Sequence, residues 1–165
     1  MSTLTSAILR GALQAIYSDG GTGKVTISRS PLIQLSEGNG TDQANRVYEA
    51  GATSTGYSIA ASGTLVLNLS SLTDAFGTAI AATKIKAILI EHLRLSASSG
   101  VTIGGGTNPV FGTQIVGLTL NAGDPFMYGR RTGYTVTPTS ADRLTITNLD
   151  GTNAAKVRVT LILSQ

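Results

Sequence analysis

The sequence predicts an all-β protein: an antiparallel β-sandwich of jelly-roll-like form that carries an N-terminal arm. Short segments in which apolar and polar residues alternate recur along the 165 residues, and turn residues separate them roughly every 8 to 15 positions. Long amphipathic helical patterns are nearly absent. The length fits one core, which we expect in residues 37–165, with an arm or first strands in residues 1–36.

The arm is apolar, but its spacing differs from that of the later strands. On a helix, one stripe would contain Leu4, Ile8, Leu13 and Ile16. Gly11 and the β-rich remainder favour a strand or an extended arm instead. We expect these four residues to contact a partner. Arg10 lies among the apolar residues and no basic residue precedes them, so the segment does not resemble a secretory signal.

The alternating segments that follow are expected to be strands. They comprise residues 24–28, 64–69, 84–95, 101–103, 118–120, 126–128, 134–136, 143–147 and 156–161. Asp150-Gly151 is a hairpin signal between the last two. Residues 71–76 fit a single helical turn that Gly77 would end. The expected core contains Ile85, Leu89, Leu144, Ile146, Val157, Val159 and Leu161, on the inward faces of the three longest strands.

Charge is sparse, at 13% of residues against about 25% in ordinary soluble domains. Residues 50–73 and 95–123 contain no Asp, Glu, Lys, Arg or His, yet polar residues interrupt both, so neither is expected to span a membrane. The net charge is +3 and the only adjacent basic pair is Arg130-Arg131, which does not predict a specific nucleic-acid partner. So little charge favours subunit interfaces, and we expect a homo-oligomer.

The residue inventory argues against an enzyme and against a cofactor. His92 is the only histidine and no GxSxG motif accompanies it, so a catalytic triad is not expected. Without cysteine, thiolate metal sites are excluded. An all-oxygen Ca²⁺ site remains an alternative at Asp19, Asp42, Asp124 or Asp150, without EF-hand spacing. Residues 20–24 fail the phosphate-loop pattern. For Asp142 we expect a structural role, in which it caps local amides.

Several motifs resemble, in order, those of small virion structural proteins of tailed bacteriophages. The similar segments are residues 38–48 (GNGTDQANRVY), 71–77 (SLTDAFG), 84–88 (KIKAI), 101–105 (VTIGG), 133–137 (GYTVT) and 142–148 (DRLTITN). Residues 121–124 replace the family's usual proline and double glycine. The resemblance covers about residue 38 to the C-terminus.

The resemblance implies a decoration or cement protein that forms a homotrimer and binds the major capsid protein on the capsid surface of the virion. Rings of three are a common closed symmetry for identical subunits. The alternative is a receptor-binding or tail-fibre module. Tyr128 and Tyr134, near Arg130 and Arg131, are the aromatic cluster that this alternative would use. Arg130 and Arg131 are therefore further candidates for partner contact.

Overall fold

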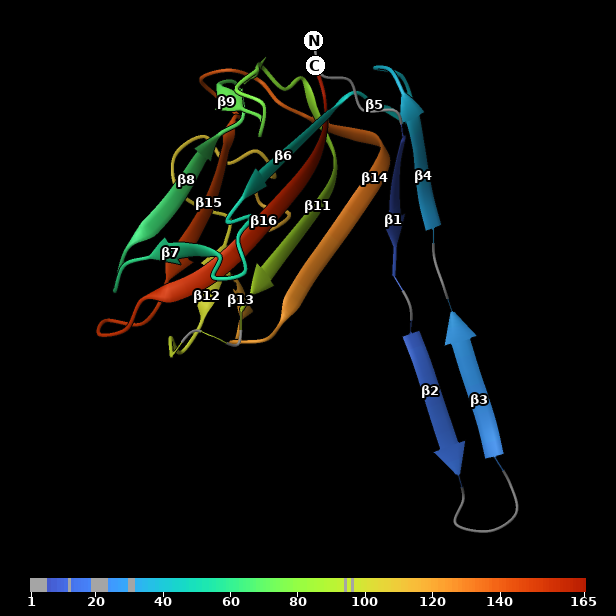
Figure 1. Ribbon diagram of the computed structural model, residues 1–165, viewed down its shortest axis with the longest axis vertical. Coiled ribbons are helices and arrows are strands. Elements are labelled where there is room, and N and C mark those ends of the chain that lie inside the picture. The colour runs from blue at the N-terminus through green and yellow to red at the C-terminus, as the bar shows by residue number, and fades with distance from the viewer. Residues whose placement is uncertain (1–5, 12, 19–23, 30–31, 94, 96) are drawn as a thin grey trace.

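The protein is a β-sandwich with a projecting arm (Figure 1). The computed structural model describes residues 6–11, 13–18, 24–29, 32–93, 95 and 97–165, and every regular element in these ranges is a strand. One sheet has the order β14 (Pro125–Thr135), β11 (Lys84–His92), β16 (Ala155–Ser164) and β6 (Arg46–Ala50), with β7 (Tyr57–Ile59) also on β16. The other has the order β13 (Leu118–Leu120), β12 (Val101–Ile103), β15 (Arg143–Asn148) and β8 (Thr64–Asn68). All pairings within both sheets are antiparallel.

The core lies between the two sheets, as the alternating pattern predicts. Six of the seven expected core residues are buried, namely Ile85, Leu144, Ile146, Val157, Val159 and Leu161. Residues from loops and short strands close the core, among them Phe111 and Ile80. A single core of this kind is what a 165-residue chain can build.

The prediction that Leu89 lies in the core is wrong, because a β-bulge interrupts β11. Ile85 pairs with Leu163 and Ala87 with Ile162, so Lys86 is an extra residue without a partner on β16. An extra residue reverses the alternation that follows it. Ile88, at 1% exposure, therefore faces the core, while Leu89 is only half-buried.

The segments expected as two strands at 126–128 and 134–136 are parts of one long strand, β14. On the side of β11, Ile85 pairs with Tyr134 and Ala87 pairs with Gly129. Residues 130–133 thus lie opposite Lys86 alone. This wide irregularity in the edge strand carries both Arg130 and Arg131.

The helical turn considered for residues 71–76 is replaced by a small hairpin of β9 (Leu72–Thr73) and β10 (Ala79–Ile80). Asp74 closes it, since its carboxylate accepts backbone N–H groups from Phe76 at 2.9 Å and Thr78 at 2.8 Å. Gly77 has a φ of 80°, which glycine adopts without strain. Local capping by aspartate therefore favours the turn over the helix.

The N-terminal segment forms strands rather than a helix. β1 (Ser6–Arg10) pairs with β4 (Leu32–Glu37), and β4 also pairs in parallel with β5 (Gln43–Ala44). β2 (Leu13–Ser18) and β3 (Lys24–Arg29) form an antiparallel hairpin. Figure 1 shows β1 and β4 beside β14, and the β2–β3 hairpin extending past the end of the sandwich.

Candidate functional site

The base of the arm, strands β1 and β4, rests on the sandwich at a glycine. Leu9 and Ile33 are paired across the arm and point to the same face. A Cβ atom at Gly129 of β14 would lie 2.8 Å from Ile33 Cδ1 and closer still to Leu9 Cδ2. Because glycine has no side chain, the Leu9 and Ile33 side chains occupy the space beside Gly129. We call this contact the arm seat.

A buried lysine fixes the turn that follows the arm. Lys86 is 1% exposed, and its Nζ donates hydrogen bonds to the carbonyl oxygens of Gly40 at 2.7 Å and Arg131 at 3.1 Å. The Arg131 guanidinium pairs with the Asp42 carboxylate through two hydrogen bonds. Asp42 N also donates to Arg131 O at 3.2 Å. Lys86, Arg131 and the turn of residues 38–42 form what we call the arm root.

Electrostatics in the arm root follow from these contacts. The hydrogen bond with Arg131 holds the pKa of the Asp42 carboxyl below its usual value. Burial lowers the pKa of Lys86, because desolvation disfavours its charged form. The two carbonyl acceptors offset this by solvating the ammonium. The arm root therefore uses charged side chains, which are rare in this chain, to join β11 and β14 to the turn that follows the arm.

The other predicted contact residues are dispersed. Ile8 is 58% exposed on the outer face of β1. Leu13 and Ile16 lie on β2, whose backbone is described without its side chains, and Leu4 lies outside the described residues. Arg130, the neighbour of the root residue Arg131, lies 5.3 Å from the ring centroid of Tyr134. The adjacent arginines thus belong to two different places.

Aromatic side chains gather along β14, as the sequence suggested. Tyr134 donates its hydroxyl hydrogen to the hydroxyl of Tyr128 at 2.7 Å and packs edge-on against Phe111 at 4.9 Å between ring centroids. Burial and the hydrogen bond with Tyr128 raise the pKa of Tyr134 to about 12. Phe126 and Tyr128 also line a groove against residues 114–118. Phe111 belongs to the core, and Phe126 and Tyr134 pack against its edge. Tyr128 is more exposed than these three rings.

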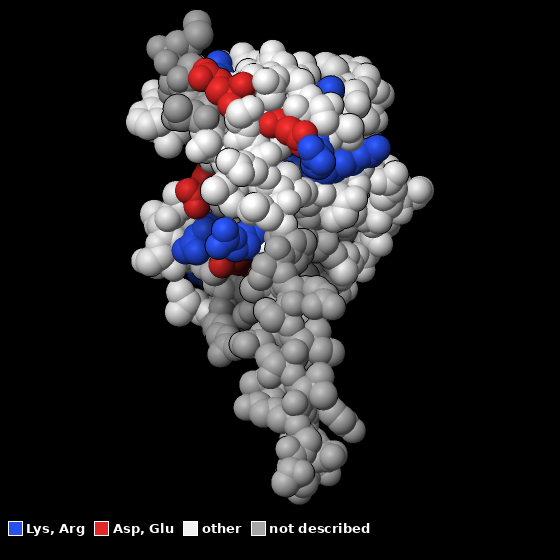
Figure 2. Space-filling model, turned by 90° about the vertical axis from the view of Figure 1, so that its right-hand side faces the viewer, with Lys and Arg blue, Asp and Glu red and all other residues white. Residues whose placement is uncertain are grey.

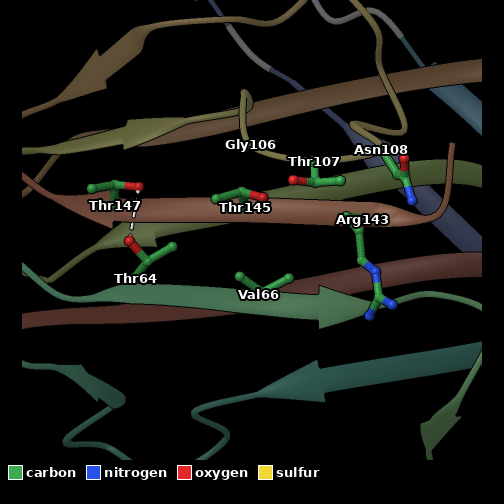
Figure 3. Close-up of a pocket in the computed structure, with 8 residues that line it drawn as sticks. All are labelled: Thr64, Val66, Gly106, Thr107, Asn108, Arg143, Thr145 and Thr147. Carbon is green, nitrogen blue, oxygen red and sulfur yellow. Dashed lines mark hydrogen bonds between the residues drawn. The ribbon is translucent and has the colours of Figure 1, made fainter. Parts of the chain in front are cut away.

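An open groove on the outer face of the four-stranded sheet carries polar groups that the sequence analysis did not single out (Figure 3). It has a volume of about 400 Å³ and is lined by Thr64, Val66, Gly106, Thr107, Asn108, Arg143, Thr145 and Thr147. Thr64 and Thr147 are hydrogen-bonded through their hydroxyls at 3.2 Å. Alternation places Arg143, Thr145 and Thr147 on one face of β15, a signal present in the sequence.

The structure assigns structural roles to several other candidates. Asp142 caps local groups as predicted, since its carboxylate accepts Thr139 N–H at 3.0 Å. His92 is buried, and its Nδ1 donates to the carbonyl oxygen of Leu120 at 3.0 Å. Among the Ca²⁺ candidates, Asp19 lies outside the described residues. Asp42, Asp124 and Asp150 each accept hydrogen bonds from N–H donors.

In the part of the chain that the structure describes, no three His, Cys, Asp or Glu side chains come together to hold a metal ion. The described residues also include no helix with the length and hydropathy required to cross a membrane. Comparisons with protein-family models, with characterised proteins and with solved structures find no match to this chain.

Proposed function

We propose that the protein is a non-enzymatic virion structural protein of jelly-roll-like form. In this role it decorates or cements the head of a tailed phage by binding the major capsid protein on the capsid surface. The resemblance of residues 38–165 to small phage virion proteins supports this proposal. The observation that carries it is the β2–β3 hairpin, which extends beyond the sandwich from a base held by the arm seat and arm root (Figure 1).

The hairpin is suited to joining one subunit to another. Within the described residues, β2 and β3 pair only with each other, so each has one edge without a neighbouring strand. Free strand edges present unpaired N–H and C=O groups that a strand of another chain can satisfy. An isolated two-stranded hairpin is marginally stable, so contact with a neighbour would also stabilise the arm itself.

The surface supports assembly into a homotrimer. On the face drawn in Figure 2, charged side chains lie in a few small groups, with wide areas of uncharged residues between them. Such areas on a soluble chain are suited to contact between subunits. Multi-angle light scattering at micromolar concentration is expected to give three times the chain mass of 16.9 kDa. A monomer that persists at high concentration would contradict the trimer.

A deletion that spares the arm base tests the proposal. Arg10 and Leu32 are paired, so an Asn-Gly turn can replace residues 11–31 and close β1 onto β4. This variant is expected to keep its circular dichroism spectrum and lose binding to purified phage heads that lack the protein. Thr119→Ala, an exposed change on the sandwich, is the control and is expected to bind like the wild type. Undiminished head binding by the deletion variant would refute the arm as the attachment element.

The alternative is a receptor-binding or tail-fibre module, and the exposed Tyr128 at the edge of β14 favours it. Aromatic rings at a surface are common anchors in recognition sites. If the protein co-purifies with tails and binds host cells, and Tyr128→Ala abolishes this binding, the alternative is correct. Binding to heads alone supports decoration.

A further inference from the structure

We propose that the groove over Thr145 binds an acidic saccharide, with the carboxylate of the sugar on Arg143 and its hydroxyl groups on the threonine and asparagine side chains. The site is independent of the arm and of whether the protein lies on a head or a tail. Three features support this inference: the wall of the groove, the hydroxyl of Thr145 and the guanidinium of Arg143.

The groove is preformed, because its wall is tied to β15 at both ends. Gly104 N donates to Thr145 O at 2.9 Å, and Val110 N donates to Arg143 O at 2.9 Å. Asn108 O accepts the N–H of Arg143, also at 2.9 Å. A Cβ atom at Gly106 would lie 3.1 Å from Thr145 Oγ1, so a larger residue there would narrow the groove above the threonine. Preformed sites bind without a large ordering cost.

The hydroxyl of Thr145 is the second feature that supports a ligand site in the groove. Thr145 is 6% exposed as a whole residue, and its side chain faces the groove between the strand and the wall (Figure 3). Its hydroxyl has no hydrogen-bond partner among the described residues. This hydroxyl is open to the groove, so a polar ligand there can exchange hydrogen bonds with it. Thr64 and Thr147 bond to each other and still offer one donor and three acceptor lone pairs between them.

Arg143 supplies the positive charge at one end of the groove. Its Nε lies 3.4 Å from Oδ1 of the buried Asp142 and forms an ion pair with this carboxylate. Neither Nη atom hydrogen-bonds to any described residue, and the side chain is about one-third exposed. A guanidinium with two free Nη groups matches the two oxygens of a carboxylate.

The rest of the groove lining favours a sugar acid over a nucleotide. The lining residues contain no acidic side chain, and Val66 is half-exposed between the hydroxyl groups. A sugar ring presents both C–H faces and hydroxyl groups, so it fits an apolar residue flanked by threonines. A nucleotide would need an aromatic platform or further basic groups, and the lining has neither. The volume of about 400 Å³ lies within the usual range of ligand sites.

Titration of the full chain with uronic-acid and sialic-acid oligosaccharides, followed by calorimetry and amide NMR shifts, tests the site. Carboxyl-reduced oligosaccharides are the neutral probes. Thr145→Val keeps the shape and removes the hydroxyl, and we expect affinity to fall about 2- to 12-fold. Arg143→Gln is expected to reduce affinity for the acidic probes by about 10-fold or more. It should change affinity for the neutral probes little.

Thr119→Val is the matched control, because it removes an exposed hydroxyl from the same sheet outside the groove. Unchanged melting temperatures identify the variants that remain folded, and Thr145→Val alone tests the site if Arg143→Gln does not fold. The proposal is overturned if no acidic saccharide binds. It is also overturned if Thr145→Val and Thr119→Val bind equally, or if the neutral probes bind as tightly as the acidic ones.

Discussion

The Nζ atom of Lys86 lies 2.7 Å from the carbonyl oxygen of Gly40, and this hydrogen bond joins the bulge of a central strand to the turn after the arm. A second bond from the same ammonium reaches the carbonyl oxygen of Arg131 on the edge strand. The charge of Lys86 is buried for a structural reason, since it satisfies two backbone acceptors where the sheet is irregular.

Lys86→Met is expected to destabilise the protein by about 1.5 to 3 kcal/mol, the usual worth of hydrogen bonds to a charged group. Methionine fills similar space but leaves the carbonyls of Gly40 and Arg131 without their donor. Urea unfolding followed by circular dichroism measures the change. Lys84→Met, on the same strand and more exposed, is the control. An equal effect of the two substitutions would show that the arm root adds nothing to stability.

Gly129→Ala is expected to displace the arm base and leave the core intact. The added methyl group would lie too close to the ends of the Leu9 and Ile33 side chains, so either these ends turn away or the arm base shifts. The chain has no cysteine, so spin labels on Gln34→Cys and Thr119→Cys report the distance between arm and sandwich. That distance should change in Gly129→Ala.

Gly151→Ala serves as the control for the arm seat. Its φ is not positive and a Cβ there would meet only Ser62 Oγ at 3.7 Å. This variant is expected to keep the wild-type distance distribution. If Gly129→Ala keeps it too, the absence of a side chain at Gly129 does not set the position of the arm base.

The bulge predicts unequal losses of stability at two neighbouring residues. Ile88→Ala is expected to cost about 2 to 5 kcal/mol of stability, because Ile88 is a buried core side chain. Leu89→Ala is expected to cost about 1 kcal/mol, since Leu89 is half-buried on the other face. Chemical denaturation of the two variants compares them directly. A larger loss for Leu89→Ala would mean that β11 has no bulge at Lys86.

Asp150 predicts a dependence of stability on acid pH. Backbone N–H groups of Asn153, Thr152 and Ser99 donate to its carboxylate and lower its pKa to about 2. A carboxyl whose pKa is lower in the folded state than its ordinary 3.8 stabilises the fold above about pH 4, and this contribution is lost as the pH falls toward 2. The difference in melting temperature between wild type and Asp150→Asn should therefore shrink between pH 5 and pH 2. A constant difference would contradict this role.

Alternation located most strands of the sandwich, because a face that packs on a core must repeat every second residue. Residues 64–69 and 143–147 are examples, close to the observed β8 and β15. The bulge was missed because residues 87–90 are all apolar, so the sequence does not show which of them face the core, and only the pairing with β16 reveals the extra residue. The arm was expected, but the apolar spacing of residues 4–16 fits a helix and a strand about equally.

The candidate sites were less predictable than the fold. Arg130 and Arg131 are adjacent in sequence, yet one lies over Tyr134 and the other pairs with Asp42. Successive side chains of a strand point to opposite faces, which separates the two arginines, but the partner that each one meets depends on tertiary contacts. The groove exists because the loop of residues 104–109 crosses Thr145. These two parts of the chain are distant in sequence, so no local pattern predicts their contact.

If the arm joins neighbouring subunits as proposed, the β2–β3 hairpin would act as a spacer whose length is set by its strands. Each of its strands has six residues, which corresponds to a rise of about 20 Å. The arm base is already oriented on its own sandwich. Binding through the arm would therefore cost less conformational entropy than binding through a flexible tether. In a shell, this length would set the widest gap between neighbouring subunits that one molecule can bridge.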